Sequence, residues 1–316
     1  MLSVRFFPSS AVLLTSSSDH TLRIHDALSP SLTTVRTLAA HTAAVTGVAV
    51  VDRGRNVLSA SKDGTIRLWD VGGAKEIALR RWSTGAGAVA ALCLDAGEGY
   101  ESSWRGEGAP GILSAPGEVG TENKLVFAGL QDGRVEGFDL RSKRSAFSFS
   151  SKQSGQLAGG SSSANSAAID SIAFAPGSGM LAAGARSGIL RWWDLRSCGG
   201  GEGPPLCELK RNGAGIESLA WIPAEWTTSS ILQSAATPEQ EPVVLAQGLP
   251  HLAIGTEDGL PWRAGLSMDA KAVVVEEYVG YECGDGVRSI RWCAGGEDGL
   301  GRGVWCAGDD GLVRFY

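Results

Sequence analysis

Three residues near the N-terminus, His41, Ser59 and Asp63, are of the types that form a hydrolytic triad. A serine nucleophile needs a histidine base and a carboxylate that orients the histidine. In α/β-hydrolases such a serine lies in a G-x-S-x-G elbow, and the sequence contains no such motif. A buried network that satisfies each polar group is the alternative, and it would fix the local geometry of the chain. We favour this structural role.

Cysteines and histidines could together hold a metal ion. The chain has six cysteines and four histidines, and no two cysteines form a C-x-x-C pair, so we expect no zinc site. Several cysteines lie in apolar runs such as Ala91–Leu94. We therefore expect reduced, buried thiols in a protein of the cytoplasm and nucleus.

Composition and charge exclude several classes of protein. The chain has 316 residues, a net charge of −6 and a pI near 5.4, whereas nucleic-acid binders usually have a basic face. The longest uncharged apolar runs, 43–51 and 85–94, are far shorter than the roughly 20 residues of a membrane span. A signal peptide is not evident. We expect a soluble protein that binds neither nucleic acid nor membranes, and whose acidity favours a basic protein partner.

The 44 glycines indicate many tight turns, and one turn pattern repeats six times. Each copy has a small-residue strand, a turn and a strand that ends in an aromatic residue. Four copies carry Asp-Gly at the turn, which tolerates positive φ well. The copies begin at Thr15, Ser59, Ala128, Ala183, Ile254 and Ala307.

A further strand-like run precedes each copy, and a candidate outer strand follows each of the first five, such as 33–38, 76–82 and 272–279. Four strands per repeat predict the blade of a WD-repeat β-propeller, an all-β fold in which blades bury their faces against one another. The alternative is an ordinary β-sandwich. The chain ends at Tyr316, so we expect the sixth unit to lack its outer strand.

We expect a single domain over 1–316, although the turns are unevenly spaced. Insertions at 96–123 and 224–250 fall between strands of the third and fifth units. A third, at 151–168, links the third unit to the fourth. We interpret all three as mobile surface loops.

The second unit has the residue types that form a hydrogen-bonded network within a blade of WD repeats. In such repeats the aspartate bonds the histidine, the histidine bonds the serine and the serine bonds the tryptophan ring. The corresponding residues are Asp63, His41, Ser59 and Trp69.

Several segments resemble the proteasomal ATPase-associated factor family, whose members are WD-repeat assembly chaperones of the proteasome regulatory particle. The most specific segment is 52–56 running into Ser59-Ala60-Ser61. Three more agree, namely 6–10, 128–133 with 139–142, and 306–316. The resemblance implies about seven blades, one of them in an N-terminal region that precedes the matched part. It also implies binding to the C-terminal domain of an ATPase subunit of the proteasome base. The mechanism that the resemblance implies is steric gating, without catalysis.

The partner surface is predicted from the turns. The residue before each turn aspartate lies on the rim of one face of a propeller, and these residues differ between units: Lys62, Gln131, Arg186, Glu257 and Asp309. They are either a binding surface or solvated turn residues. We expect a monomeric, non-catalytic binding platform without cofactors. The alternatives are a scaffold or substrate receptor of a ubiquitin ligase or another complex, and a propeller enzyme, for which converging carboxylates are missing.

Overall fold

In its described residues the computed structural model consists of strands and tight turns, together with a 3-10 helix at Ala224–Trp226. It describes residues 2–51, 53–81, 83–84, 87–98, 117–119, 121, 124–140, 144–150, 168–175, 177–198, 203–227, 231–232, 243–246, 248–278, 285–293 and 303–316. The chain forms two compact units. Unit 1 comprises 1–169 with 198–203, and unit 2 comprises 170–197 with 204–316.

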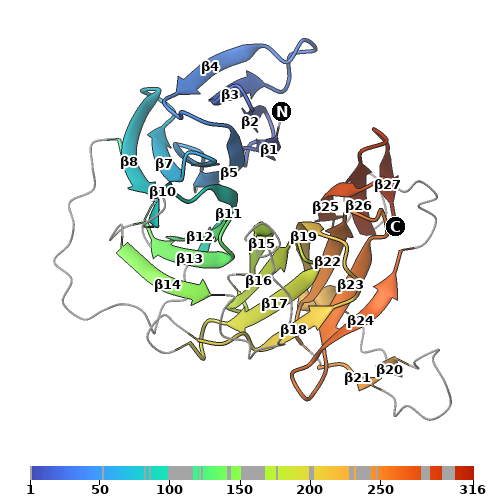
Figure 1. The fold of residues 1–316 in the computed structure, drawn as a ribbon. Helices are drawn as coiled ribbons and strands as arrows, with labels where there is room; N and C mark the ends of the chain where they lie inside the picture. The colour runs from blue at the N-terminus through green and yellow to red at the C-terminus, as the bar shows by residue number, and fades with distance from the viewer. Residues whose placement is uncertain are drawn as a thin grey trace. The chain divides into compact units, whose positions relative to one another are not determined.

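Unit 1 contains three antiparallel four-stranded sheets, each in simple chain order. Blade 1 is β1 (Ser3–Phe6), β2 (Val12–Ser16), β3 (Thr21–Asp26) and β4 (Thr34–Ala39). Blade 2 is β5 (Val45–Val51), β6 (Asn56–Ser61), β7 (Thr65–Asp70) and β8 (Lys75–Arg81). Blade 3 is β11 (Ala91–Glu98), β12 (Lys124–Leu130), β13 (Arg134–Asp139) and β14 (Arg144–Ser150). The short pair β9 (Ser83–Thr84) and β10 (Gly87–Ala88) connects the last two (Figure 1).

Unit 2 contains the other three blades. Blade 4 is β15 (Ile169–Ala175), β16 (Met180–Ala185), β17 (Ile189–Asp194) and β18 (Cys207–Lys210), its first residue falling in unit 1. Blade 5 is β19 (Ile216–Ile222), β22 (His251–Thr256), β23 (Trp262–Leu266) and β24 (Ala272–Glu277). Blade 6 has three strands in the described part, β25 (Val287–Cys293), β26 (Gly303–Gly308) and β27 (Val313–Phe315). The six sheets are thus the blades of a β-propeller, and among the described residues the sixth sheet has three strands, which agrees with the prediction that its outer strand is missing.

The repeated turns have one backbone conformation. In each of the six hairpins the second turn residue has a positive φ, between 71° and 86°. Glycine reaches this region without steric cost, which explains five of the six choices. The residues are His20, Gly64, Gly133, Gly188, Gly259 and Gly311.

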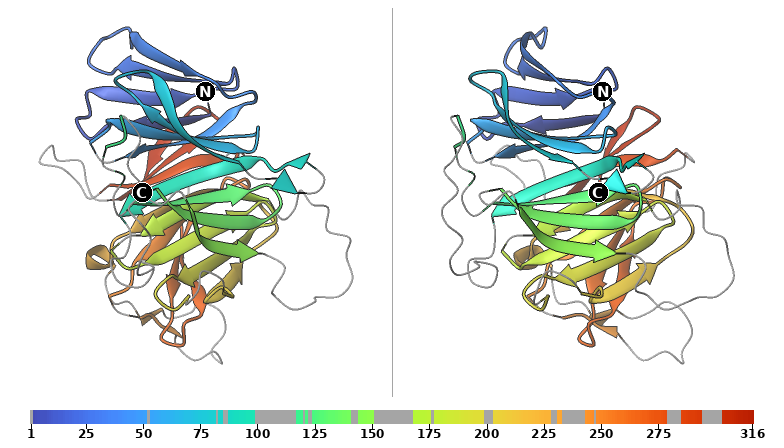
Figure 2. Two further views of the ribbon diagram at one scale, coloured as in Figure 1. Left: turned by 90° about the vertical axis from the view of Figure 1, so that its left-hand side faces the viewer. Right: turned by 60° about the vertical axis from the view of Figure 1, so that its left-hand side comes forward.

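Apolar cores lie between consecutive sheets. In unit 1, one core joins blades 1 and 2 around Leu14, Leu38 and Trp69, and a second joins blades 2 and 3 around Leu58 and Phe138. Figure 2 shows the sheets of unit 1 lying face to face in chain order. In unit 2, matching cores lie between blades 4 and 5 and between blades 5 and 6. Within each unit, neighbouring blades therefore stabilise one another by burying apolar surface.

Polar side chains join the innermost strands of neighbouring blades. Thr46 Oγ1 donates to the carbonyl oxygen of Ala91 at 2.7 Å in unit 1. In unit 2, Ser171 Oγ donates to the carbonyl oxygen of Ile216 at 3.0 Å. These bonds satisfy edge groups that would otherwise be buried without partners.

The segment predicted as an insertion at 96–123 is partly ordered. β11 extends to Glu98, so the prediction that the insertion begins at residue 96 is wrong by three residues. At its other end, the buried amide of Asn56 donates to the carbonyl oxygens of Trp69 and Gly117, each at 3.1 Å, and accepts from Val119 N at 2.6 Å. Blade 2 thereby fixes the chain that leads into β12.

The predicted insertion at 224–250 also contains structure. It includes the 3-10 helix and a short hairpin of β20 (Ile231–Leu232) and β21 (Val243–Val244). Leu245 is 4% exposed and forms an isolated bridge with Ser267. The interpretation as a wholly mobile loop is therefore wrong for this part. The insertion predicted at 151–168 lies outside the described residues except for Ala168.

One detail of the repeat alignment is also wrong. The fifth copy was aligned with Trp262 as the aromatic residue that ends its third strand. Trp262 instead begins β23 and pairs with Ile254, whereas Trp69 pairs with Val57 late in β7. Among the described residues no helix has the length and apolar character needed to cross a bilayer.

Candidate protein-binding face

The four residues singled out in blade 2 are joined in a continuous chain of hydrogen bonds. Trp69 Nε1 donates to Ser59 Oγ at 2.8 Å, and Ser59 Oγ lies 2.7 Å from His41 Nε2. His41 Nδ1 lies 2.8 Å from Asp63 Oδ2. Thr65, which sequence reasoning missed, donates to the other carboxylate oxygen of Asp63 at 2.5 Å. The arrangement ties the turn to two strands and to the segment before β5.

The proton positions in this network follow from burial. Burial lowers the pKa of His41 more than the neighbouring Asp63 raises it, so the ring is neutral near pH 7. Because the carboxylate only accepts, Nδ1 carries the proton and Nε2 accepts from Ser59. Burial opposes ionisation of Asp63, but hydrogen bonds from Thr65, His41 and the Thr42 N–H lower its pKa overall. Ser59 is fully buried, and its hydroxyl donates to the His41 ring in the interior. The hydroxyl is therefore not accessible to a substrate in solvent.

The turn aspartates are explained by a local bond that recurs in five of the six blades. In each, Oδ1 accepts the backbone N–H of the residue two positions later, at 2.9 to 3.1 Å. Such Asx turns stabilise a hairpin without any long-range partner. The aspartates are Asp19, Asp63, Asp132, Asp258 and Asp310.

The five predicted rim residues occupy equivalent positions. All are exposed, and four share one backbone bond, in which their N–H donates at 2.9 to 3.1 Å to the residue just before the innermost strand of the same blade. This bond fixes the point at which each side chain leaves the sheet. Lys62 and Gln131 lie on unit 1; Arg186, Glu257 and Asp309 lie on unit 2.

On unit 2 the rim residues belong to a charged network. Arg186 forms two 2.8 Å bonds with the carboxylate of Asp170 in β15. Asp309 accepts two 2.9 Å bonds from Arg288 Nε in β25, and Arg288 also pairs with Glu217 in β19 at 3.1 Å. We call Asp170, Arg186, Glu217, Glu257, Arg288 and Asp309 the charged face of unit 2.

The charged face has an excess of carboxylates. It contains four carboxylates and two guanidinium groups, so it is net negative. Burial raises the pKa of Glu217, and the nearby carboxylates of Asp170 and Glu257 add to this effect against the attraction of Arg288. The Arg288 guanidinium holds the pKa of Asp309 below its usual range. A cationic group placed here would relieve the repulsion among these carboxylates.

The partners of the rim residues were missed by sequence reasoning. Asp170, Glu217 and Arg288 are each the second residue of an innermost strand. An alignment of those strands beside the turns would have revealed a charged residue at this position in each of the last three units. In the described part of the chain, no group of three or more His, Cys, Asp or Glu residues is arranged to hold a metal ion.

Comparison with known proteins agrees with the repeat pattern. Residues 1–26 and 32–70 match the WD domain, G-beta repeat, and residues 86–238 match the nucleolar protein 10-like N-terminal domain, a β-propeller model. The chain is therefore a WD-repeat β-propeller, a class that serves as a protein-binding scaffold.

Two curated proteins are similar over most of the chain. The ribosome biogenesis protein WDR12 homolog of Chlamydomonas reinhardtii is 23% identical over 99% of the chain, which covers 63% of that protein. The 26S proteasome regulatory subunit RPN14 of Saccharomyces cerevisiae is 31% identical over 81% of the chain, which covers 58% of its length. The chain thus spans about three fifths of each relative.

Solved structures share the fold at low sequence identity. The U3-55K structure has a TM-score of 0.60 at 14% sequence identity. The aligned region covers 96% of this chain and 72% of the U3-55K chain. A chain of the mitotic checkpoint complex has a TM-score of 0.63 at 17% sequence identity. The aligned region covers 99% of this chain and 73% of that chain. These similarities support the propeller fold alone.

Proposed function

We propose that this propeller is a non-catalytic chaperone that binds the C-terminal domain of an ATPase subunit of the proteasome base during assembly of the regulatory particle. The observation that carries the proposal is the 31% identity to the proteasome regulatory subunit RPN14. The sequence segments in blades 2, 3 and 6 point to the same class of partner.

The charge distribution supports a basic partner. Unit 2 holds 18 of the 34 acidic residues but 11 of the 28 Lys and Arg residues, so it carries the acidity of the chain. Its charged face presents Glu257 and Asp309 to solvent. An acidic surface speeds the encounter with a cationic domain and selects against acidic ones.

Affinity purification of the tagged full chain tests the proposal. We expect base ATPase subunits to co-purify without subunits of the proteolytic core particle, because a chaperone dissociates before the regulatory particle joins the core. The untagged chain is the control. Recovery of complete proteasomes, or of no ATPase subunit, would contradict the proposal.

A charge-reversal variant tests the face. Glu257→Lys with Asp309→Lys should weaken binding to a purified ATPase C-terminal domain about tenfold at low salt, since opposite charges become like charges. Calorimetric titration measures the affinity. The matched control reverses two exposed carboxylates elsewhere on unit 2, Glu225→Lys with Asp269→Lys. Equal affinities of the two double variants would exclude this face.

A role in ribosome assembly is the second candidate. It is favoured by the match to the WDR12 homolog over 99% of the chain and by the nucleolar protein 10-like model. The same purification separates the two functions, because a ribosome-assembly factor would bring down pre-ribosomal proteins in place of ATPase subunits.

A further inference from the structure

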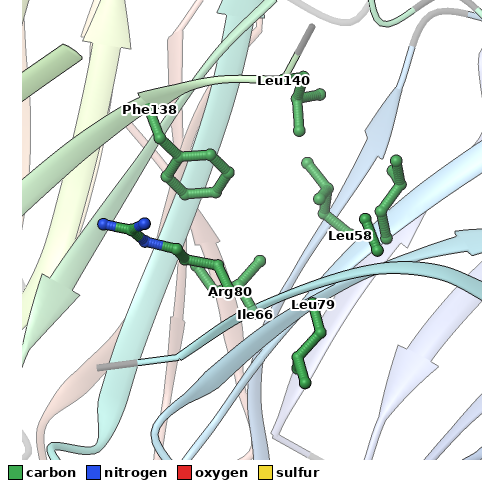
Figure 3. Close-up of a pocket in the computed structure, with 8 residues that line it drawn as sticks. Leu58, Ile66, Leu79, Arg80, Phe138 and Leu140 are labelled. Atoms are coloured by element: carbon green, nitrogen blue, oxygen red, sulfur yellow. The ribbon is translucent and has the colours of Figure 1, made fainter. Parts of the chain in front are cut away.

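Three hydroxyl groups meet at the surface in the loop 27–33, which joins β3 to β4 in blade 1. Ser29 Oγ lies 3.1 Å from Ser31 Oγ and 3.1 Å from Thr33 Oγ1. The apolar cavity between blades 2 and 3 differs in kind, because none of its eight lining residues has a nucleophilic side chain (Figure 3). The loop therefore offers oxygen nucleophiles at the surface, whereas the cavity offers none.

The residue that follows Ser29 distinguishes it from the other two hydroxyls. It is Pro30, and in the described part of the chain this is the only serine or threonine directly followed by proline. Proline has no backbone N–H, so a protein kinase can hold this position in an apolar pocket without burying an unpaired donor. Ser31 precedes Leu32, which carries an N–H. A proline-directed kinase would therefore select Ser29 over Ser31.

The two ends of the loop are anchored on the sheet, and its middle projects from it. Asp26 N donates to the carbonyl oxygen of Thr33 at 3.0 Å, and Ala27 N donates to that of Ala11 at 2.9 Å. Between these anchors Leu28 is 77% exposed. An enzyme can thus engage the middle of the loop while the strands of blade 1 stay paired.

The middle of the loop forms a turn that opens at low cost. Leu32 N donates to the carbonyl oxygen of Ser29 at 2.9 Å, with Pro30 in the second position of the turn. Kinases bind their acceptor segments in extended form, and the φ that proline fixes is compatible with both the turn and an extended chain. Opening the turn breaks this one backbone bond and the contacts between hydroxyls. Water replaces them, because the loop is exposed.

We propose that Ser29 is a phosphorylation site for a proline-directed protein kinase. In this reaction Ser29 Oγ forms a bond to the γ-phosphorus of ATP as the bond from that phosphorus to ADP breaks. The hydroxyl proton passes to the carboxylate base of the kinase. The hydroxyls of Ser31 and Thr33 are placed to donate hydrogen bonds to the phosphate oxygens.

The modification would change the charge of blade 1. Residues 26–33 include one carboxylate, Asp26, and no Lys or Arg, so a phosphate makes this segment strongly anionic. The site goes beyond the proposed chaperone function, because it lies in unit 1 and involves none of the residues of the charged face of unit 2.

Incubation of the purified full chain with a mitogen-activated protein kinase and Mg-ATP tests the proposal. The substitution Thr237→Ala removes the other Thr-Pro or Ser-Pro dipeptide of the sequence, which lies outside the described residues, and serves as the background. We expect intact-mass spectrometry to show a single phosphate and fragmentation to place it on Ser29. Relative to a synthetic peptide of residues 22–36, kcat/KM should fall by no more than about tenfold, equivalent to about 1.4 kcal/mol, because only the turn must open.

Matched variants separate recognition from folding. Pro30→Ala keeps the hydroxyl and removes the recognition residue, so kcat/KM should fall at least about tenfold. Ser29→Ala should abolish phosphorylation, Ser29→Thr should retain it, and Ser31→Ala should leave it unchanged. Thermal melting checks that these exposed substitutions leave the fold intact.

The outcome is independent of the chaperone function. Glu257→Lys with Asp309→Lys should be phosphorylated like the wild type, so a failure of the charged face would leave this proposal standing. A folded chain without phosphate on Ser29, whether or not the peptide reacts, would overturn it. So would phosphate on Ser31 in its place, or equal rates for Pro30→Ala and the wild type.

Discussion

Blades 2 and 5 use the same position before the innermost strand in different ways. His41 lies four residues before β5, and Asn212 lies four residues before β19. Each bonds the turn aspartate of its own blade: His41 Nδ1 lies 2.8 Å from Asp63, and Asn212 Nδ2 donates to Asp258 at 2.7 Å. The long-range anchor of the turn is therefore common to both blades.

The two anchors differ in what lies behind them. In blade 2 the bond continues inward through Ser59 to Trp69, whereas the equivalent positions of blade 5 are Ile254 and Ala264, both fully buried. Asn212 is exposed, so water competes for its bond. A hydrogen bond in the interior cannot be replaced by water when it is lost, which makes the network of blade 2 costly to interrupt.

The largest expected effect follows from cutting the buried network. His41→Ala leaves Ser59 and the Asp63 carboxylate without their ring partner and should lower the free energy of unfolding by about 3 kcal/mol. Urea denaturation measures the change, and hydrogen exchange should locate the loss of protection in β6 and β7. If His41→Ala lowered the free energy of unfolding no more than the substitution Asn212→Ala in blade 5, the contrast between the two blades would be contradicted.

A second effect sharpens the contrast through pH. His251 in blade 5 is 3% exposed, and burial followed by the nearby Arg263 lowers its pKa to about 4. The unfolded chain then binds a proton first as the pH falls below about 6.5, so stability should decrease from there towards pH 4. At pH 5 the loss is about 2 kcal/mol.

His251→Leu should remove this part of the pH dependence, as measured by urea denaturation at pH 7 and pH 5. The pKa of His41 is lowered as well, which contributes with the same sign, so the variant keeps a residual slope. An identical slope in wild type and variant would rule out the assignment to His251.

The smallest expected effect is at the exposed anchor. Asn212→Ala should lower the free energy of unfolding by about 0.5 kcal/mol, because Asp258 keeps its bonds from Thr256 Oγ1 and Leu260 N. Thermal melting of the variant beside His41→Ala measures the difference. A loss above about 2 kcal/mol would show that the turn anchor itself, and not the network behind it, carries the stability.

Local chemistry explains which parts of the structure were predictable. The predicted strand-like run before each turn is present, for example as Val45–Val51 in blade 2 and Val287–Cys293 in blade 6, since a strand beside a turn is encoded in a few consecutive residues. The turn aspartates accept hydrogen bonds from the backbone two positions later, so their structural role could also be predicted from the sequence.

Features that depend on register between distant segments were not predictable. One ion pair of the charged face, between Glu217 in β19 and Arg288 in β25, joins strands from different blades. Trp262 was a separate error, because it lies four residues after Asp258, as Arg67 lies after Asp63, and this spacing already places it at the start of β23.

The amide of Asn56 has a consequence for engineering this chain. It bonds Trp69 within its own blade and Gly117 and Val119 from the segment between two strands of the next. Removing that segment to create a tight hairpin would leave the carboxamide in the interior without two of its three partners. Loop shortening at this place should therefore destabilise two successive repeats at once, unless Asn56 is replaced by an apolar residue in the same step.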